Sequence, residues 1–311
     1  MTETTTVRKE QLSGASAPAR RPSGTGRPRA HASHRTAQIL MTAVALLLAV
    51  YFLFPLVWQV VASTKTSNQL ATTPGLLPLI PVNLRENLTD LVTRENGIFL
   101  RWMLNSVLYA VIGGLAATAF SGAAGYALAF LRFRGKTALT VAILIGTLLP
   151  GTVLAFPLFL VMVRFGLVDT YWSVLLPSMI SPLAIFLARM FASQAMPYSM
   201  IEAARIDGAG EIRIALGFGF RLMAPGLVTI FLIQVVAIWN NFFLPLILLN
   251  DTELFPSTLG LYVWNSRVTQ APEYTVLVIV GALVSALPLI ALFLTLQRYW
   301  RSGLAAGAVK G

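Results

Sequence analysis

The sequence predicts an all-α membrane protein with six transmembrane helices. Of its 311 residues, 56% are hydrophobic and only 11% are charged, whereas a soluble domain carries about a quarter charged residues. A helix that crosses a bilayer needs about 20 apolar residues. Six stretches come close to or exceed this length, at residues 37–62, 102–131, 138–163, 172–188, 225–249 and 275–297. The sequence therefore leaves no room for a separate soluble domain.

The N-terminal part, residues 1–35, is a basic tail rich in Ser, Thr, Gly, Pro and Arg. Such a composition cannot bury a hydrophobic core, so we expect the tail to be disordered. Its two histidines, His31 and His34, are expected to be solvated rather than bound to a metal. The apolar run that follows is longer than the roughly 7–15 residues of a signal-peptide core, so we expect it to remain as the first span.

Residues 36–311 are expected to form one transmembrane domain in which prolines shape several elements. The outer loop at residues 63–100 is rich in Pro and turn residues, and residues 85–102 could form a short surface helix within and after it. Pro150 and Pro157 are expected to kink the third span. The fourth span is interrupted by Pro177 and Pro182, which membrane helices tolerate when neighbours satisfy the freed backbone groups.

The distribution of Lys and Arg predicts the orientation. With the N-terminus in the cytoplasm, 17 of these residues lie inside and six outside. This excess indicates that both termini are cytoplasmic. It places residues 193–224, which we call the central polar loop, on the same side. The net charge of +11 therefore reflects membrane topology, and nucleic acid is not an expected partner. The expected location is a multi-pass protein of the cytoplasmic (inner) membrane.

The predicted spans contain no Asp, Glu, Lys or Arg away from their ends. Proton-driven carriers place ionisable groups in the membrane, so this absence argues against proton coupling, although sodium coupling through backbone carbonyls stays open. The chain also lacks a phosphate-binding loop, cysteine and any Ser/His/Asp set. We therefore expect no catalytic residues, no metal site and an energy source on another subunit.

The central polar loop is predicted to form a helix, a turn and a second helix. Pro197 can open the first helix, and Asp207-Gly208 can end it. The second helix runs from Glu211 to about Leu222, with Ile212, Ala215 and Leu216 at helical spacing. An ordinary solvated loop of mixed charge is the alternative. A DNA-binding helix-turn-helix is disfavoured because acids balance the bases.

Two short motifs in this loop, and a proline just after it, carry a resemblance to a known family. Glu202-Ala203-Ala204, then Asp207-Gly208-Ala209, then Pro225 resemble the EAA loop of binding-protein-dependent ABC-transporter permeases. The stretches at residues 239–251 and 297–311 are similar to permeases of carbohydrate importers. The likeness covers residues 36–311. It departs from the family at Phe220-Arg221, where a Leu-Pro pair is usual, and Gly217 and Gly219 weaken the second helix by about 1 kcal/mol each.

The resemblance implies a permease with the type I ABC importer architecture that imports a sugar by alternating access. Its implied partners are a homologous permease in a heterodimer, two ATPase subunits, an extracytoplasmic sugar-binding protein and membrane lipid. ATP-Mg would be used by the ATPase subunits, and this chain would bind no cofactor. The first helix of the loop would be the coupling helix. Its implied ATPase-docking residues are Glu202, Ala203, Ala204, Arg205, Asp207 and Gly208, with Glu202 as the polar contact, the alanines for close packing and Gly208 as the turn.

Two alternatives to a sugar permease remain open at this point. One is an ABC permease for another solute, such as a polyamine or glycerol phosphate. The other is a secondary carrier that works without further subunits.

Polar side chains within two spans are candidates for the substrate path. Amides can hydrogen-bond to hydroxyl groups and an indole can stack on a sugar ring. Gln234 and Asn241 are seven residues apart, which predicts a shared helix face. The alternative is that these groups join helices to one another. The candidate residues are Gln234, Trp239, Asn240 and Asn241 in the fifth span and Asn105 and Tyr109 in the second.

Overall fold

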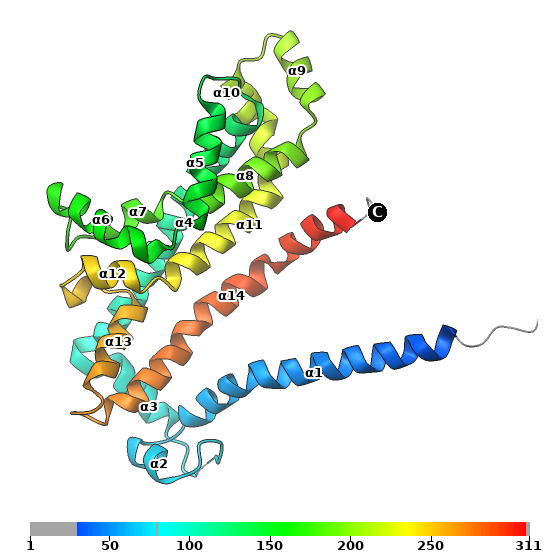
Figure 1. Cartoon of the computed structure of the whole chain (residues 1–311). Coiled ribbons are helices and arrows are strands. Elements are labelled where there is room, and N and C mark those ends of the chain that lie inside the picture. The colour runs from blue at the N-terminus through cyan, green and yellow to red at the C-terminus, as the bar shows by residue number, and fades with distance from the viewer. Residues whose placement is uncertain (1–29, 79, 309–311) are drawn as a thin grey trace, which may run out of the picture. The chain divides into compact units, whose positions relative to one another are not determined.

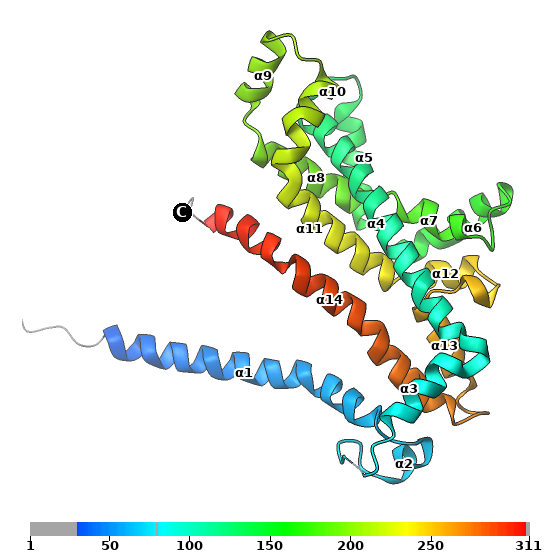
Figure 2. The ribbon, with the colours of Figure 1, turned by 180° about the vertical axis from the view of Figure 1, so that it is seen from behind.

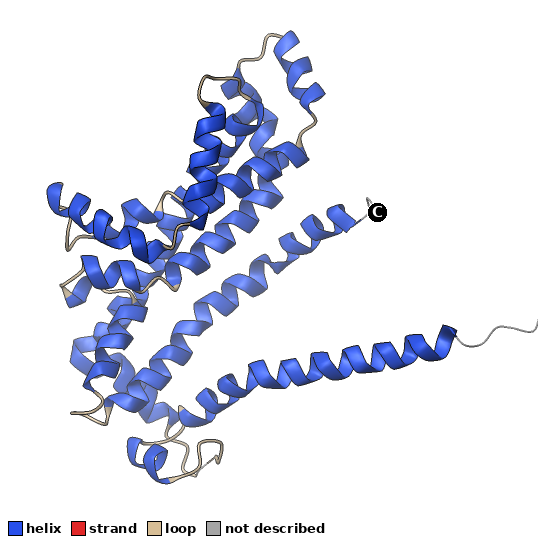
Figure 3. Ribbon diagram, viewed as in Figure 1, coloured by secondary structure: helices blue, strands red, loops and turns tan. Residues whose placement is uncertain are grey.

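The computed structural model describes the backbone of residues 30–78 and 80–308, and the side chains of residues 37–78 and 80–297. Within these ranges every regular element is a helix and no strand occurs (Figure 3). The predicted disorder of residues 1–29 and the solvation of His31 and His34 lie outside the described parts. The chain forms two units, residues 1–54 and 55–311.

The first unit consists, where it is described, of the helix α1 (Ala30–Ala62), which continues past the unit boundary. This helix begins at Ala30 and therefore includes the last residues of the predicted tail. From Ala37 to Ala62 it is long and apolar enough to cross a membrane. The predicted first span is thus present as one helix.

The second unit contains the remaining spans. Five described helices of the chain are apolar and long enough to cross a membrane, or six if a strongly bent pair counts as one span. The central helices of the second unit are α4, α8 and α11, which lie side by side (Figures 1 and 2). The spans are built from α4 (Ile98–Phe130), α5 (Lys136–Leu148), α6 (Gly151–Arg164), α7 (Tyr171–Ser178), α8 (Pro182–Ala195), α10 (Glu211–Ile214), the π turn η2 (Ala215–Gly219), α11 (Phe220–Trp239) and α14 (Tyr274–Ala308).

The third predicted span is wrong as a single kinked helix, because α5 and α6 are bent by 108° at their junction. The break lies at Leu149 and Pro150, both of which have extended backbone. A proline disfavours helical geometry in the residue before it and lacks the N–H that a continuous helix needs. Pro157, in contrast, stays inside α6. The fourth span is interrupted as predicted, between α7 and α8, where Pro182 opens the second piece.

The fifth span ends earlier than predicted, because α11 ends at Trp239. The Asn240 side chain donates a 2.8 Å hydrogen bond to the Val236 carbonyl, and a short helix, α12 (Phe243–Leu248), begins after the turn. Asparagine side chains compete with the helical backbone in this way. Asn241 therefore lies outside the helix, and the predicted shared face of Gln234 and Asn241 is wrong.

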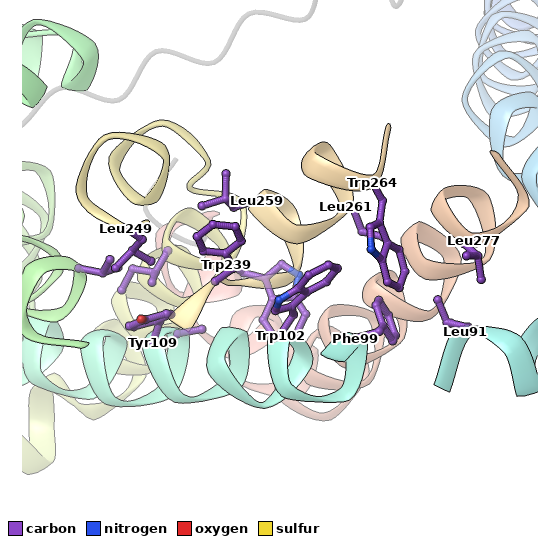
Figure 4. Close-up of a cluster of buried hydrophobic side chains, with 14 of the residues drawn as sticks. Leu91, Phe99, Trp102, Tyr109, Trp239, Leu249, Leu259, Leu261, Trp264 and Leu277 are labelled. Atoms are coloured by element: carbon purple, nitrogen blue, oxygen red, sulfur yellow. The ribbon is translucent and has the colours of Figure 1, made fainter. Parts of the chain in front are cut away.

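The end of the second unit that lies away from the central polar loop is built from short helices and the start of α4 and α14 (Figure 1). Trp102 and Trp264 are fully buried there, with ring centroids 4.8 Å apart. Figure 4 shows Phe99 beside Trp264 and Trp102 along the same face of α4. The short helices are α2 (Ser67–Thr72), α3 (Leu84–Thr93), η1 (Arg94–Gly97), η3 (Thr252–Leu254) and α13 (Ser257–Arg267).

Glycines let the central helices approach closely. A Cβ atom at Gly125 would overlap the backbone of α8 at Ala188 and Arg189. A Cβ at Gly114 would lie 2.8 Å from a methyl group of Val235 on α11. Small residues at helix contacts are typical of membrane bundles, where backbones pack closely. These contacts fix α4 against α8 and α11, whose ends hold the central polar loop.

Candidate functional site

The central polar loop contains a short helix, α9 (Tyr198–Ile206), preceded by Pro197 and ended by Asp207. Gly208 has a φ of +79°. The Gly208 N–H donates a hydrogen bond to the Arg205 carbonyl, and the Ala209 N–H donates one to the Ala204 carbonyl, both at 3.0 Å. This is the Schellman arrangement, which satisfies the last carbonyls of a helix and favours glycine at the left-handed position. The predicted turn at Gly208 is confirmed.

One face of α9 packs on the ends of the spans. Ile201 is fully buried, in a cluster with Met196 before α9 and Ile214 in α10. Tyr126 and Phe130 close this cluster from the last turns of α4. Ala204 is half-buried against the same cluster. Of the two alanines predicted to pack against a partner, Ala204 therefore contacts its own chain and only Ala203 is exposed.

Arg205 joins α9 to two other elements. Its Nε atom donates a 2.6 Å hydrogen bond to Oε1 of Glu211, at the start of α10. Nη2 donates to the carbonyl of Phe130, the last residue of α4, at 3.2 Å. The Tyr198 hydroxyl accepts from Arg205 Nη1 at 3.5 Å and from Arg132 Nη2 at 3.2 Å. Arg205 is therefore engaged within the chain and holds α9 in a fixed position.

The charge of Arg205 is stabilised by these contacts. The hydrogen bond that Arg205 donates to Glu211 is the largest influence and raises the pKa of Arg205 above its ordinary value, while burial opposes the shift. A guanidinium that donates to a carboxylate, a carbonyl and a phenol uses the planar fork that distinguishes arginine from lysine. The Arg205 guanidinium therefore stays charged under all physiological conditions.

The opposite face of α9 is free in the described part of the chain. Glu202, Ala203 and Asp207 are exposed, and Ile206 is 85% exposed. Glu202 and Ile206 are four residues apart and so are neighbours on the helix surface. Within the residues whose side chains are described, Glu202 has neither a hydrogen bond nor an ion pair. The face thus combines an unpaired carboxylate with an exposed apolar side chain.

The second helix of the loop differs from the prediction. Ile212 and Leu216, expected to share a packed face with Ala215, are 77% and 63% exposed, while Ile214 and Ala215 are buried. Ile212 and Leu216 are four residues apart and share the outward face, while Ile214 and Ala215 pack into the cluster with Tyr126 and Phe130. The helix also does not end near Leu222 but continues through the π turn into α11. Ile212 and Leu216 consequently add apolar surface at the same end of the molecule as α9.

Sequence reasoning missed three residues that hold α9, namely Tyr198, Glu211 and Phe130. One signal was available for Glu211, because it carries the charge opposite to Arg205 six residues away across a glycine turn. The carbonyl of Phe130 has no sequence signal. It is 75 residues from Arg205 and offers only a backbone atom.

The structure places the predicted substrate-path residues of α4 inside the protein. Asn105 donates to the carbonyls of Glu253 and Phe255, at 2.7 and 3.0 Å, and accepts from the Tyr171 hydroxyl at 3.0 Å. The Tyr109 hydroxyl donates to the Leu254 carbonyl at 2.9 Å. Both side chains are buried. In this structure they join α4 to the loop around η3, which is the alternative reading of polar groups in membrane helices.

The candidates near the end of α11 are also mostly engaged. Gln234 is buried and donates to the Ser181 hydroxyl at 3.2 Å, and Trp239 is buried in the cluster of Figure 4. The Asn241 side chain accepts from the Leu244 N–H at 3.3 Å. Asn240 is exposed. The structure therefore does not bring the six candidates together around one cavity.

An apolar groove of about 640 Å³ lies between α4, α11 and Leu296 of α14. None of the substrate-path candidates lines it. Its walls are almost entirely carbon, which suits a lipid chain or a neighbouring helix better than a sugar. Its lining consists of Leu115, Thr118, Ala119, Gly122, Ala123, Phe220, Ala224, Leu227, Val228, Phe231 and Leu296.

Comparisons with known proteins assign the family. Residues 121–304 match the family described as binding-protein-dependent transport system inner membrane component. The chain is 32% identical over 272 residues to the arabinooligosaccharides transport system permease protein AraQ of Halalkalibacterium halodurans, covering 88% of this chain and 96% of the relative. It is 30% identical over 278 residues to the lactose transport system permease protein LacG of Rhizobium radiobacter, covering 89% and 97%.

A solved structure shares the fold. It is a bacterial ABC transporter described as involved in the import of the acidic polysaccharide alginate, and one of its chains superposes with a TM-score of 0.72 at 22% identity. The superposition covers 89% of this chain and 99% of that chain. Together with the braced helix α9 and its glycine turn, these matches show that the chain belongs to the inner-membrane permeases of binding-protein-dependent ABC importers.

Proposed function

We propose that this permease imports a sugar, in a complex with a homologous permease, two ATPase subunits and an extracytoplasmic sugar-binding protein. The relatives named for arabinooligosaccharides and lactose support a carbohydrate substrate. The interiors of the spans carry no Lys or Arg, which favours a neutral substrate over a phosphorylated one, because a phosphate in the membrane would require a cationic partner.

The observation that carries the proposal is the geometry of α9. One face is buried through Ile201 and braced through Arg205, and the other presents Glu202, Ala203 and Ile206. A helix held so firmly on one side can transmit a displacement without deforming, because packed interiors resist compression. The exposed face supplies what a docking helix needs, namely a charge for orientation and an apolar contact.

The proposed orientation places α9 in the cytoplasm, on the basis of the Lys and Arg distribution. Both termini lie on the same side. ATP binds to the two ATPase subunits and supplies the energy that moves these two subunits toward each other. Glu202 and Ile206 would lie in a groove of one ATPase subunit, and α9 would pass the motion to α4 through the Phe130 carbonyl and to α11 through Glu211.

Reconstitution of the full complex in vesicles tests the function. The expected result is uptake of a radiolabelled sugar, such as an arabinooligosaccharide, that requires ATP, the ATPase subunits and the binding protein together. Uptake by this chain alone would indicate a self-sufficient carrier. Uptake of glycerol 3-phosphate or a polyamine, without sugar uptake by the same vesicles, would contradict the proposed substrate class.

A further inference from the structure

We infer that the π turn at Ala215–Gly219 is a two-state joint between α9 and α11, and that Tyr126 and Glu211 act as positioning residues for it. In one state the turn is π-helical, as here, and in the other it is α-helical. The inference rests on the proposed function, since such a joint acts only when α9 receives motion from an ATPase subunit.

The turn interrupts one continuous helical run, from Glu211 to Trp239. The N–H of Phe220 bonds the carbonyl of Ala215, five residues earlier, where an α-helix would use a residue four earlier. A π turn thus holds one residue more than the α-helix needs, and such turns occur frequently at functional sites. If the turn rewinds as an α-helix, the part of the chain on its N-terminal side rotates by about 100° and shifts by about 1.5 Å along the helix axis.

Two glycines make the turn deformable on one side and close-packed on the other. A Cβ atom at Gly217 would meet nothing within 4 Å. A Cβ at Gly219 would lie 3.2 Å from the Tyr126 ring and 3.3 Å from the Ile214 carbonyl. Glycine also has the lowest conformational preference for an α-helix apart from proline. The backbone can therefore change its winding at Gly217 while Gly219 stays against α4.

Two polar atoms at this joint lack partners in the described structure. The Tyr126 hydroxyl and Oε2 of Glu211 are both buried, and neither has a hydrogen bond among the described residues. Tyr126 packs in one cluster with Ile214, three residues after Glu211, and the other carboxylate oxygen of Glu211 accepts from Arg205 Nε. Tyr126 belongs to α4, whereas Glu211 is the first residue of the helical run. Buried polar groups in proteins nearly always have partners, so these two indicate a second arrangement in which they meet.

Rotation of Glu211 about the axis of the run supplies that arrangement. In the α-helical state the Tyr126 hydroxyl donates to the Glu211 carboxylate, and the π turn is lost. Because Glu211 also binds Arg205, α9 moves with it. Motion of α9 is thereby converted into a rotation of its attachment to α11, with two preferred end points.

Distance measurements between spin labels test the joint directly. The chain has no cysteine, so Arg213→Cys with Arg221→Cys places two labels on exposed positions that flank the turn. The labelled chain is assembled with its partner permease and ATPase subunits and compared without nucleotide and after trapping with Mg-ATP and vanadate. The expected result is a change of several ångströms in the main distance. An unchanged distance in a complex that hydrolyses ATP would overturn the inference.

Deletion of Gly217 removes the extra residue and closes the turn to an α-helix, while Gly217→Ala keeps the residue count as the matched control. In the deletion variant we expect continued ATP hydrolysis with a label distance that no longer depends on nucleotide. A distance that still responds to nucleotide, as in Gly217→Ala, would count against a joint at this position. If the deletion prevents assembly, the label pair in the full-length chain still decides the question.

Tyr126→Phe tests the proposed partner of Glu211. Tyr126→Phe removes the hydrogen bond proposed for the α-helical state. The ratio of molecules at the nucleotide-trapped label distance to those at the nucleotide-free distance should therefore fall about fivefold. Equal populations in Tyr126→Phe and the parent chain would remove Tyr126 from the joint. Absence of ATPase subunits from every preparation, parent chain included, would instead contradict the proposed function.

Discussion

Arg205 and Glu211 lie on opposite sides of the Gly208 turn, and their side chains meet in a 2.6 Å hydrogen-bonded ion pair. The pair connects α9 to the helical run that becomes α11. The bond from Arg205 to the Phe130 carbonyl ties α9 to the end of α4 as well.

Arg205→Ala is expected to destabilise the central polar loop by about 1 kcal/mol. The ion pair with Glu211 is about one-third exposed, so its loss accounts for only part of this free energy. Loss of the hydrogen bond to the Phe130 carbonyl accounts for a similar part. Protease sensitivity of the loop in detergent measures the effect. Arg213→Ala is the control, because Arg213 is exposed. Equal protease sensitivity of the two variants would contradict a role of Arg205 in holding α9.

The contribution of Arg205 is expected to be independent of pH between about pH 6 and about pH 9. The hydrogen bond to Glu211 raises the pKa of Arg205 above its ordinary value, which already lies far above this range. A raised pKa gives stability that is fully present below the ordinary value and is lost only as pH rises through the folded-state value. The stability difference between the parent chain and Arg205→Ala should therefore stay constant in thermal unfolding across this range. A difference that shrinks toward pH 9 would show that the pair does not hold the charge.

Gly208→Ala is expected to cost about 1 kcal/mol, because Gly208 has a φ of +79° and an L-residue is strained in this region. A Cβ atom there would meet nothing within 4 Å, so the effect is conformational and not steric. Gly210→Ala is the matched control. Gly210 is equally open but has a φ of −71°. Protease sensitivity of the loop should rise in the first variant only.

Glu202→Lys is expected to reduce co-purification of the ATPase subunits at least tenfold while leaving the thermal stability of the isolated chain unchanged. Glu202 is exposed and makes no ion pair with any residue whose side chain is described. Glu273→Lys reverses an exposed charge just before the start of α14 and serves as control. A loss of stability in Glu202→Lys, or full retention of the ATPase, would contradict a docking role.

Asn105→Ala is expected to destabilise the chain by about 3 kcal/mol, because two buried carbonyls and the Tyr171 hydroxyl lose their partner. Tyr109→Phe loses one bond and should cost about 1 kcal/mol. Asn240→Ala, at an exposed position, should change little. Thermal unfolding ranks the three variants. If Asn105→Ala is stable but raises the KM for uptake, Asn105 contacts the substrate after all.

Much of the fold and part of the site could be predicted from the sequence. The spans follow from apolar length, and the end of α9 follows from Asp207-Gly208, because both depend on local chemistry. The docking residues of α9 were predicted as a group from the resemblance, but the structure separates them. Glu202 and Ala203 face outward, while Ala204 and Arg205 contact their own chain.

The substrate path could not be predicted, because the partners of its residues are distant in the sequence. Asn105 meets carbonyls 148 and 150 residues away, and such backbone acceptors leave no pattern in the residue types. Ile212 and Leu216 have helical spacing, yet they face outward, because the cluster with Tyr126 and Phe130 buries Ile214 and Ala215 instead.

The sequence by itself determined that this protein is a helical membrane permease with a helix-turn element in its central polar loop, since burial in lipid demands long apolar helices and a tight turn demands glycine. Only the tertiary structure decided which face of α9 is free, where the third span bends and how the second helix winds. These features depend on contacts between residues far apart in the chain, and hydrophobic periodicity does not encode them.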